Sequence, residues 1–255
     1  MGRLISNNTM RNLIIVCLVF VSGLVQGQKT SGRIIYETSR EIAKTLAKAK
    51  FLSKEEKDRE SETMKNWFSQ KTKYALNFTE KKSFYTFENQ QETTEDGSFN
   101  YTHDDFYLTR DFEKGTYFDY QNVLGKTYIV EDSLNAYNWK IMNDVKDVAG
   151  YICMKALAYD ALKDQKIEAW FCTDFVTSSG PDRFYGLPGV ILEVTLDDGA
   201  YVISALSVDT NSALEYPKLP KKVKGKKINT GGYTKIIADY IKQSEAMHRL
   251  PWWLY

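Results

Sequence analysis

The sequence predicts a mainly β protein of the α+β class, with a curved antiparallel sheet or open half-barrel of about ten strands. A helical insertion near the N-terminus and a helix near the C-terminus complete the prediction. Two observations support it. From Thr72 to Glu131, and again from Gly150 to Val208, short runs of alternating apolar and polar residues follow one another closely. No helical stretch separates these runs, as parallel strands would require.

Residues 1–27 have the layout of a cleaved secretory signal. Arg11 and Asn12 precede an apolar run over 13–21 that is too short to span a bilayer. Val25-Gln26-Gly27 is an acceptable cleavage site, and either Met1 or Met10 could be the start. We therefore expect export to the periplasm or to the outer membrane. Residues 28–255 are enough for one β-rich domain.

The first strand is predicted at Gly32–Glu37, and the pattern then changes to helical over about 39–70. Ser39 could cap a first helix. Ser53 and Glu56 have the spacing of a capping box for a second helix.

Two predicted strands, 150–159 and 166–173, are joined by a turn near Leu162-Lys163, which places Cys153 opposite Cys172. In an oxidising compartment this arrangement predicts a disulfide, and two free thiols remain the alternative. Asp96-Gly97 and Asp198-Gly199 are further hairpin signals.

The C-terminal part contains a basic linker over 217–227 and a predicted helix over about 233–248. The chain ends in an apolar run with Trp252 and Trp253. Because two exposed Trp side chains would form an unusual apolar patch, we expect them to fold back on the protein, or to contact a partner or a membrane surface.

Composition and motifs exclude several classes of function. The formal net charge is +1, so nothing favours nucleic acid as a partner. The two histidines, His103 and His248, lack a cluster of metal-ligand spacing, and no Rossmann or P-loop glycine pattern is present. We therefore predict no metal, no cofactor and no catalytic residue.

Two alternatives remain open. Phe, Trp and Tyr make up 14% of the chain and could line a half-barrel cavity for an apolar ligand or a lipoprotein. Glu168, Asp174 and Glu193 could converge as the carboxylates of a hydrolase.

The most distinctive stretch is the loop over 178–189, which leads into an apolar β-branched run. Its glycines and prolines favour left-handed or rigid backbone conformations and therefore predict a structural turn, with a type II turn at 187–190. These residues are Gly180, Pro181, Gly186, Pro188 and Gly189. The same loop could present side chains to a ligand; these are Arg183, Phe184, Tyr185 and Leu187.

This stretch, together with Trp139-Lys140-Ile141, residues 150–156 and residues 168–171, resembles the signature of the GLPGLI family of exported Bacteroidota proteins. The resemblance covers roughly 125–210. That family has no established activity, so the resemblance implies export and fold but no catalytic residues. The sequence thus predicts a non-enzymatic binding or accessory component of the cell envelope, whose partner is an unknown envelope protein or an apolar ligand.

Overall fold

The computed structural model describes residues 29–68, 71–88, 92–93, 99–100, 106–210 and 224–250. The strands are β1 (Ser31–Arg40), β2 (Thr72–Thr79), β3 (Lys82–Phe87), β4 (Glu92–Thr93), β5 (Phe99–Asn100), β6 (Tyr107–Asp111), β7 (Thr116–Val123), β8 (Lys126–Ser133), β9 (Lys140–Val148), β10 (Tyr151–Asp160), β11 (Gln165–Cys172), β12 (Val190–Leu196), β13 (Tyr201–Asp209) and β14 (Lys226–Ile228). The α-helices are α2 (Ile42–Ala47), α3 (Lys54–Phe68) and α4 (Thr230–Ala246), and η1 (Asp197–Gly199) is a 3₁₀ turn.

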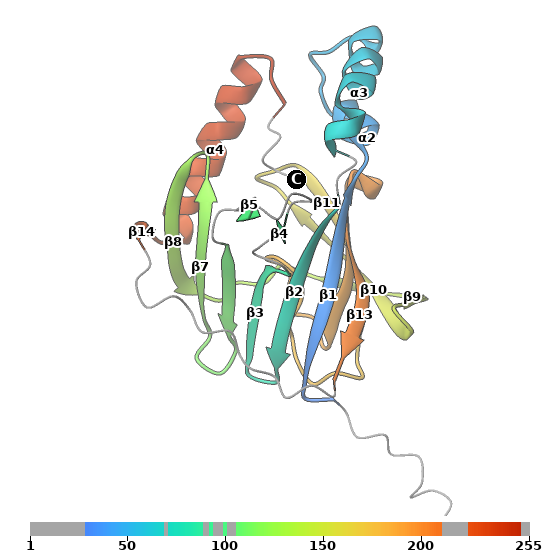
Figure 1. Cartoon of the computed structure of the whole chain (residues 1–255), viewed down its shortest axis with the longest axis vertical. Helices are drawn as coiled ribbons and strands as arrows, with labels where there is room; N and C mark the ends of the chain where they lie inside the picture. The colour runs from blue at the N-terminus through green and yellow to red at the C-terminus, as the bar shows by residue number, and fades with distance from the viewer. Residues whose placement is uncertain are drawn as a thin grey trace, which may run out of the picture.

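Twelve of these strands form one open, curved sheet in the order β14-β8-β7-β6-β3-β2-β1-β13-β12-β11-β10-β9 (Figure 1). Every neighbouring pair is antiparallel except β14 and β8, and the two short strands β4 and β5 pair only with each other. The predicted fold class is confirmed. No helix in the described ranges is long and apolar enough to cross a membrane.

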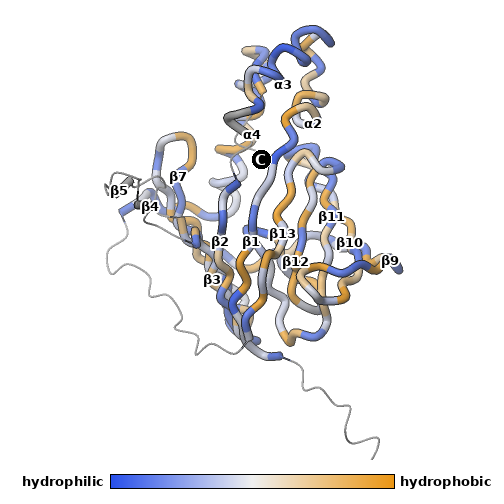
Figure 2. Tube along the Cα trace, turned by 45° about the vertical axis from the view of Figure 1, so that its right-hand side comes forward, coloured by the Kyte–Doolittle hydropathy of each residue, from blue (hydrophilic) through white to orange (hydrophobic). Residues whose placement is uncertain are grey.

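The core lies on the concave face of the sheet. Ile34 and Tyr36 of β1 are fully buried there, because alternate residues of the strand point inward. They pack with Phe175 and Leu187, which belong to the segment between β11 and β12. The Tyr36 hydroxyl donates a hydrogen bond of 2.6 Å to the carbonyl of Ile191. Figure 2 shows the apolar positions concentrated in the central strands, whereas α3 is largely hydrophilic.

The predicted helix cap at Ser39 is wrong. Ser39 and Arg40 are the last residues of β1, where they pair with Val202 and Tyr201 of β13. This ladder between distant parts of the chain continues the strand through Ser39 to Arg40, and α2 begins only at Ile42.

The capping box of the second helix is confirmed. The Ser53 N–H donates to the Glu56 carboxylate at 2.8 Å, and the Glu56 N–H donates to the Ser53 hydroxyl at 3.2 Å. This reciprocal pair satisfies two N–H groups at the start of α3.

The β10–β11 hairpin forms as predicted, with Asp160 paired to Gln165. The disulfide prediction, however, is not supported, because Cys153 and Cys172 are free and buried. The two thiols contact each other as hydrogen-bonding partners, and that contact together with burial raises the pKa of Cys153.

Residues Asp198 and Gly199 form the connection between β12 and β13, although as a 3₁₀ turn in which both have positive φ. Other predictions fall on residues outside the described ranges. These are the signal segment 1–27, the Asp96-Gly97 turn, His103 and the Trp252-Trp253 tail.

The C-terminal helix begins earlier than predicted. The Asn229 side chain accepts a hydrogen bond of 2.9 Å from the Gly232 N–H and so caps α4. The end of the predicted basic linker is also ordered, because Lys226–Ile228 forms β14 alongside β8. Residues 217–223 of that linker lie outside the described ranges.

Candidate functional site

A cavity of about 250 Å³ lies on the concave face at the β8 end of the sheet. Four parts of the chain line it: strands β6 to β8, the segment after β8, the tip of the β10–β11 hairpin with the loop over 178–189, and α4. The polar and aromatic residues of the lining are Arg110, Tyr117, Asp119, Gln121, Asn135, Tyr137, Asp160, Lys163, Arg183, Tyr185, Thr230, Tyr233 and Thr234.

Strand register explains why polar side chains point inward. Leu108 pairs with Asp119, and Arg110 pairs with Tyr117. Because paired and alternate residues share a face, Arg110, Asp119 and Gln121 project to the same side as the buried Leu108. All three are at least nine-tenths buried.

Arg110 and Asp119 form a buried ion pair. The Arg110 guanidinium donates to both carboxylate oxygens of Asp119 and to the carbonyl of Thr109. Burial raises the pKa of Asp119, although Arg110 opposes that shift. Such a pair adds little net stability, since desolvation offsets the attraction, so its placement calls for another explanation.

Arg183 enters the same cluster from the loop. Its guanidinium donates to the side-chain carbonyl oxygen of Gln121, lies 3.4 Å from Asp182 and lies 3.9 Å from Asp119. The two arginines therefore share Asp119.

Aromatic rings hold both guanidinium groups. The Arg110 guanidinium lies 5.1 Å from the ring centre of Tyr117 and 5.4 Å from that of Tyr185. The Arg183 guanidinium lies 5.0 Å from the ring centre of Tyr233 on α4. Such contacts favour a cation over a ring face and fix the orientation of the group. Burial raises the pKa of Tyr233 to about 12, so this hydroxyl stays protonated at neutral pH.

The hairpin tip supplies Asp160 and Lys163. The Asp160 carboxylate accepts hydrogen bonds from the Tyr137 hydroxyl at 3.1 Å and from the N–H groups of Leu162 and Lys163 at 3.0 and 3.1 Å. Burial lowers the pKa of Lys163.

The four side chains that were predicted to face a ligand separate into two pairs. Arg183 and Tyr185 line the cavity. Phe184 and Leu187 are buried in the core, where Phe184 stacks on Tyr137 with ring centres 5.8 Å apart. Arg183, Phe184 and Tyr185 thus alternate between the cavity and the core, whereas Leu187, which follows Gly186, lies in the core.

The loop glycines are in tight places. A Cβ on Gly189, which has φ 149°, would lie 2.1 Å from the carbonyl oxygen of Cys172. A Cβ on Gly186 (φ 95°) would lie 2.5 Å from the Ala136 Cβ, and one on Gly180 would lie 2.3 Å from the Phe184 carbonyl oxygen. Pro181 is buried and its carbonyl accepts from the Phe184 N–H at 3.0 Å.

Around Pro188 the chain turns more tightly than the predicted type II turn. The Gly189 N–H donates to the carbonyl of Leu187 at 2.8 Å, two residues earlier.

Two buried donors in the cavity lack an acceptor in the part of the chain that the structure describes. They are the Nε–H of Arg110 and an N–H of the Gln121 side-chain amide; the same amide also interacts with the Tyr233 hydroxyl, which opposes the raised pKa of Tyr233. Leaving such a group unsatisfied costs roughly 1–3 kcal/mol, so ordered water or a ligand must supply the acceptor.

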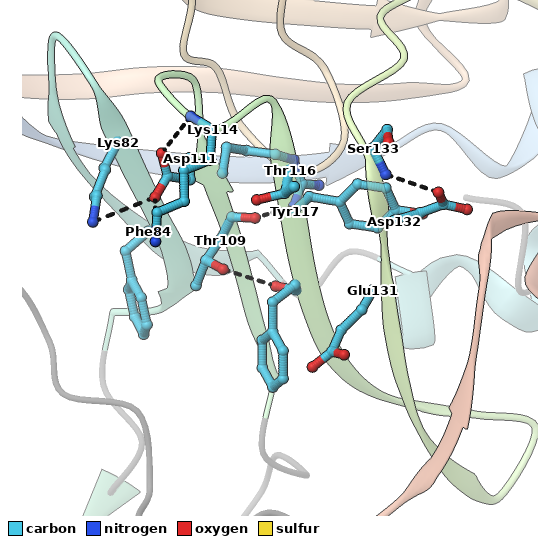
Figure 3. A pocket seen from close by; sticks show the side chains of 12 residues that line it. Lys82, Phe84, Thr109, Asp111, Lys114, Thr116, Tyr117, Glu131, Asp132 and Ser133 are labelled. Atoms are coloured by element: carbon cyan, nitrogen blue, oxygen red, sulfur yellow. Dashed lines mark hydrogen bonds and ion pairs between the residues drawn. The ribbon is translucent and has the colours of Figure 1, made fainter.

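A second, larger hollow of about 710 Å³ lies at the ends of β3, β6, β7 and β8. Figure 3 shows Lys82 and Lys114 directed at Asp111, at 3.4 and 3.9 Å. Asp132, also in this hollow, accepts from the Thr230 N–H at 3.0 Å and from its hydroxyl at 2.7 Å. Its charged groups are therefore engaged with one another, with α4, or with Lys227 of β14 and Asp119 of β7. We regard the smaller cavity as the candidate site.

The carboxylates considered for hydrolysis lie elsewhere. Glu168 pairs with Lys155 at 2.6 Å, and Glu193 pairs with Lys146 at 2.5 Å. Neither lines the cavity, and Asp174 contributes its backbone carbonyl to the Lys29 N–H. His248 follows the end of α4 and stacks on Phe51, with ring centres 5.7 Å apart.

Sequence reasoning did not find Arg110, Asp119, Gln121 or Lys163. In the sequence they read as ordinary exposed positions of strands and of a turn. The signal that could have revealed the first of them is parity, since Arg110 has the same strand parity as the apolar Leu108.

Comparison with known proteins gives a family segment and a fold. A family model described as "Protein of unknown function (Porph_ging)" matches residues 160–193. This segment contains Asp160, Lys163, Arg183 and Tyr185, so it supplies one wall of the cavity. No curated protein matches the chain.

Two solved structures of PNGF-II, in different crystal forms, share the fold. Each has 14% identity and covers 82% of this chain, with TM-scores of 0.53 and 0.54. This chain spans about a third of PNGF-II, covering 33% and 32% of the two structures. An uncharacterized conserved protein from Thermus thermophilus gives a TM-score of 0.38 at 5% identity. At this level of identity the PNGF-II structures establish the architecture alone.

Proposed function

We propose that this protein is an exported, non-enzymatic binding component of the cell envelope, which holds a small polar ligand in the cavity between β6–β8, the 178–189 loop and α4. The observation that carries the proposal is the pair of buried donors, on Arg110 and Gln121, that have no acceptor in the described chain. A ligand would complete their hydrogen bonds.

The cavity volume limits the size of the ligand. Pockets for drug-sized ligands measure about 300–1,000 Å³. A cavity of about 250 Å³ therefore suits a molecule smaller than these.

The lining also argues against the apolar-ligand alternative. The cavity contains charged groups of both signs, and an apolar molecule would leave the open donors of Arg110 and Gln121 without an acceptor. The hydrolase alternative finds no support in the lining carboxylates, since Asp119 is bound to Arg110 and Asp160 accepts three hydrogen bonds.

We also propose a relationship to the GLPGLI family, supported by the sequence of the 178–189 loop. The loop lies within residues 160–193, which match the family model of unknown function. Export through residues 1–27 is part of this proposal. N-terminal sequencing of the protein recovered from its native envelope should begin at Gln28. A chain recovered in the cytoplasm with residues 1–27 intact would contradict export.

The binding function is tested by native mass spectrometry of the full chain purified from its native cells. We expect an added small mass that is released on unfolding. The substitution Thr234→Trp places a bulky side chain at the cavity from α4 and should abolish the added mass. Lys235→Trp, on the same helix but outside the lining, should retain it. No bound mass in the unsubstituted protein, or the same mass in both variants, would contradict the proposal.

A further inference from the structure

The groups of the cavity differ in the hydrogen bonds that remain open to a ligand. Both lining carboxylates are already engaged: Asp119 accepts from Arg110, and Asp160 accepts from the Tyr137 hydroxyl and from two backbone N–H groups. Both carboxylates of the lining therefore already have hydrogen-bond donors within the protein.

The groups that can still form hydrogen bonds with a ligand include two buried donors. Arg110 is 5% exposed and Gln121 is 3% exposed, and each has a buried nitrogen without an acceptor in the described residues. A buried donor that makes no hydrogen bond destabilises the folded protein, so a complementary ligand must supply acceptor oxygens.

The lining also offers basic donors. They are Arg110, Lys163 and Arg183, and their charges are offset by Asp119 and Asp160 in the lining and by Asp182, which lies 3.4 Å from Arg183. Hydrogen bonds to an ionised acceptor are shorter and stronger than neutral ones, and Arg is suited to carboxylate and phosphate oxygens.

We infer that the ligand of the proposed site is a small organic anion, whose carboxylate or phosphate oxygens accept hydrogen bonds from the Arg110 Nε–H and the Gln121 amide. This inference rests on the proposed binding function and adds the chemical class of the ligand.

The test is calorimetric titration of the full chain, freed of any bound molecule by refolding, with three probes. The probes are succinate, inorganic phosphate and the neutral polyol erythritol. We expect saturable binding of succinate or of phosphate and none of erythritol. Which anion binds distinguishes a carboxylate ligand from a phosphate ligand.

A charge variant with a matched control locates the binding. Gln121→Glu keeps the side-chain shape, removes the donor and adds a negative charge inside the cavity. It should weaken anion binding by at least about tenfold, because like charges a few ångströms apart repel strongly at low dielectric. Asn77→Asp adds the same charge at another buried position, away from the cavity, and should leave the affinity unchanged. Circular dichroism of both variants establishes that they fold.

The outcomes separate the two proposals. Binding of erythritol without either anion, or release of a neutral or cationic molecule from the native protein, would overturn the anion inference while leaving a binding function in place. Equal anion affinity in Gln121→Glu and the unsubstituted chain would also overturn it. Failure of all three probes, together with no molecule released from the native protein, would overturn the binding function and the inference with it.

Discussion

At the scale of single residues, the structure gives a physical reason for the glycine at position 189. Its φ of 149° lies in the region that favours glycine, and the end of β11 leaves no room for a side chain. The predicted importance of this glycine thus depends more on the close approach to Cys172 than on the type of turn.

We predict that Gly189→Ala destabilises the protein by at least about 1 kcal/mol, because both the backbone conformation and the contact with the Cys172 carbonyl oppose a Cβ. Denaturant unfolding measures the change. Gly115→Ala is the control, since Gly115 also has positive φ but no atom lies within 4 Å of its Cβ position. If the two variants lose equal stability, the close approach at Gly189 contributes nothing.

A second prediction at this scale concerns Cys153 and Cys172. Since both are free and buried, alkylation should be slow in the folded protein and rapid after unfolding without reductant. The raised pKa of Cys153 adds to the protection, because the thiolate is the reactive form. Peptide mass spectrometry should find a label on each cysteine of the unfolded protein. Unlabelled peptides joined by a disulfide would show that the free-thiol structure is wrong.

At the scale of elements, the attachment of α4 depends on Asp132 of β8. Its carboxylate accepts two hydrogen bonds from Thr230, the first residue of the helix. These bonds and the Ser133 N–H lower the pKa of Asp132, with the Thr230 hydroxyl as the main cause. A negative charge at this end also suits the helix dipole.

We predict that Asp132→Ala lowers the thermal midpoint at pH 7. Because the pKa of Asp132 is depressed in the folded state, its contribution is present above the unfolded value of about 3.9 and is lost as the pH falls through the folded value. The difference between the two proteins should therefore shrink below about pH 4. The exposed Asp144→Ala is the control. A difference that does not change with pH would assign the effect to packing rather than to charge.

Local signals predicted the elements well where neighbours in sequence decide the structure. Ser53 and Glu56 begin α3, and the β10–β11 turn lies where the sequence places it. Long-range pairing decided the others: β1 continues through Ser39 because β13 lies beside it. Likewise, β14 forms because it pairs with β8, and the basic sequence of this segment does not indicate that pairing.

At the scale of the whole molecule, the sequence predicted a curved, open sheet but not the content of its concave face. That face is apolar at the centre, where the segment after β11 fills it. At the β8 end the polar cavity lies beside a second apolar cluster, formed by β7, β8 and α4. The cavity is lined by residues from the sheet, the loop and α4, which are distant in the sequence. Local sequence patterns do not predict that such residues lie together. Arg183 and Tyr185 were found because their loop is distinctive in itself.

The central claim is that the concave face holds a small ligand against Arg110 and Gln121. A high-resolution crystal structure of the full chain purified from its native cells tests it most directly. We predict density for a bound molecule larger than water, with an oxygen about 2.7–3.2 Å from the Arg110 Nε. A cavity that holds only water, or one closed by protein side chains with the Arg110 Nε–H bound to one of them, would contradict the claim.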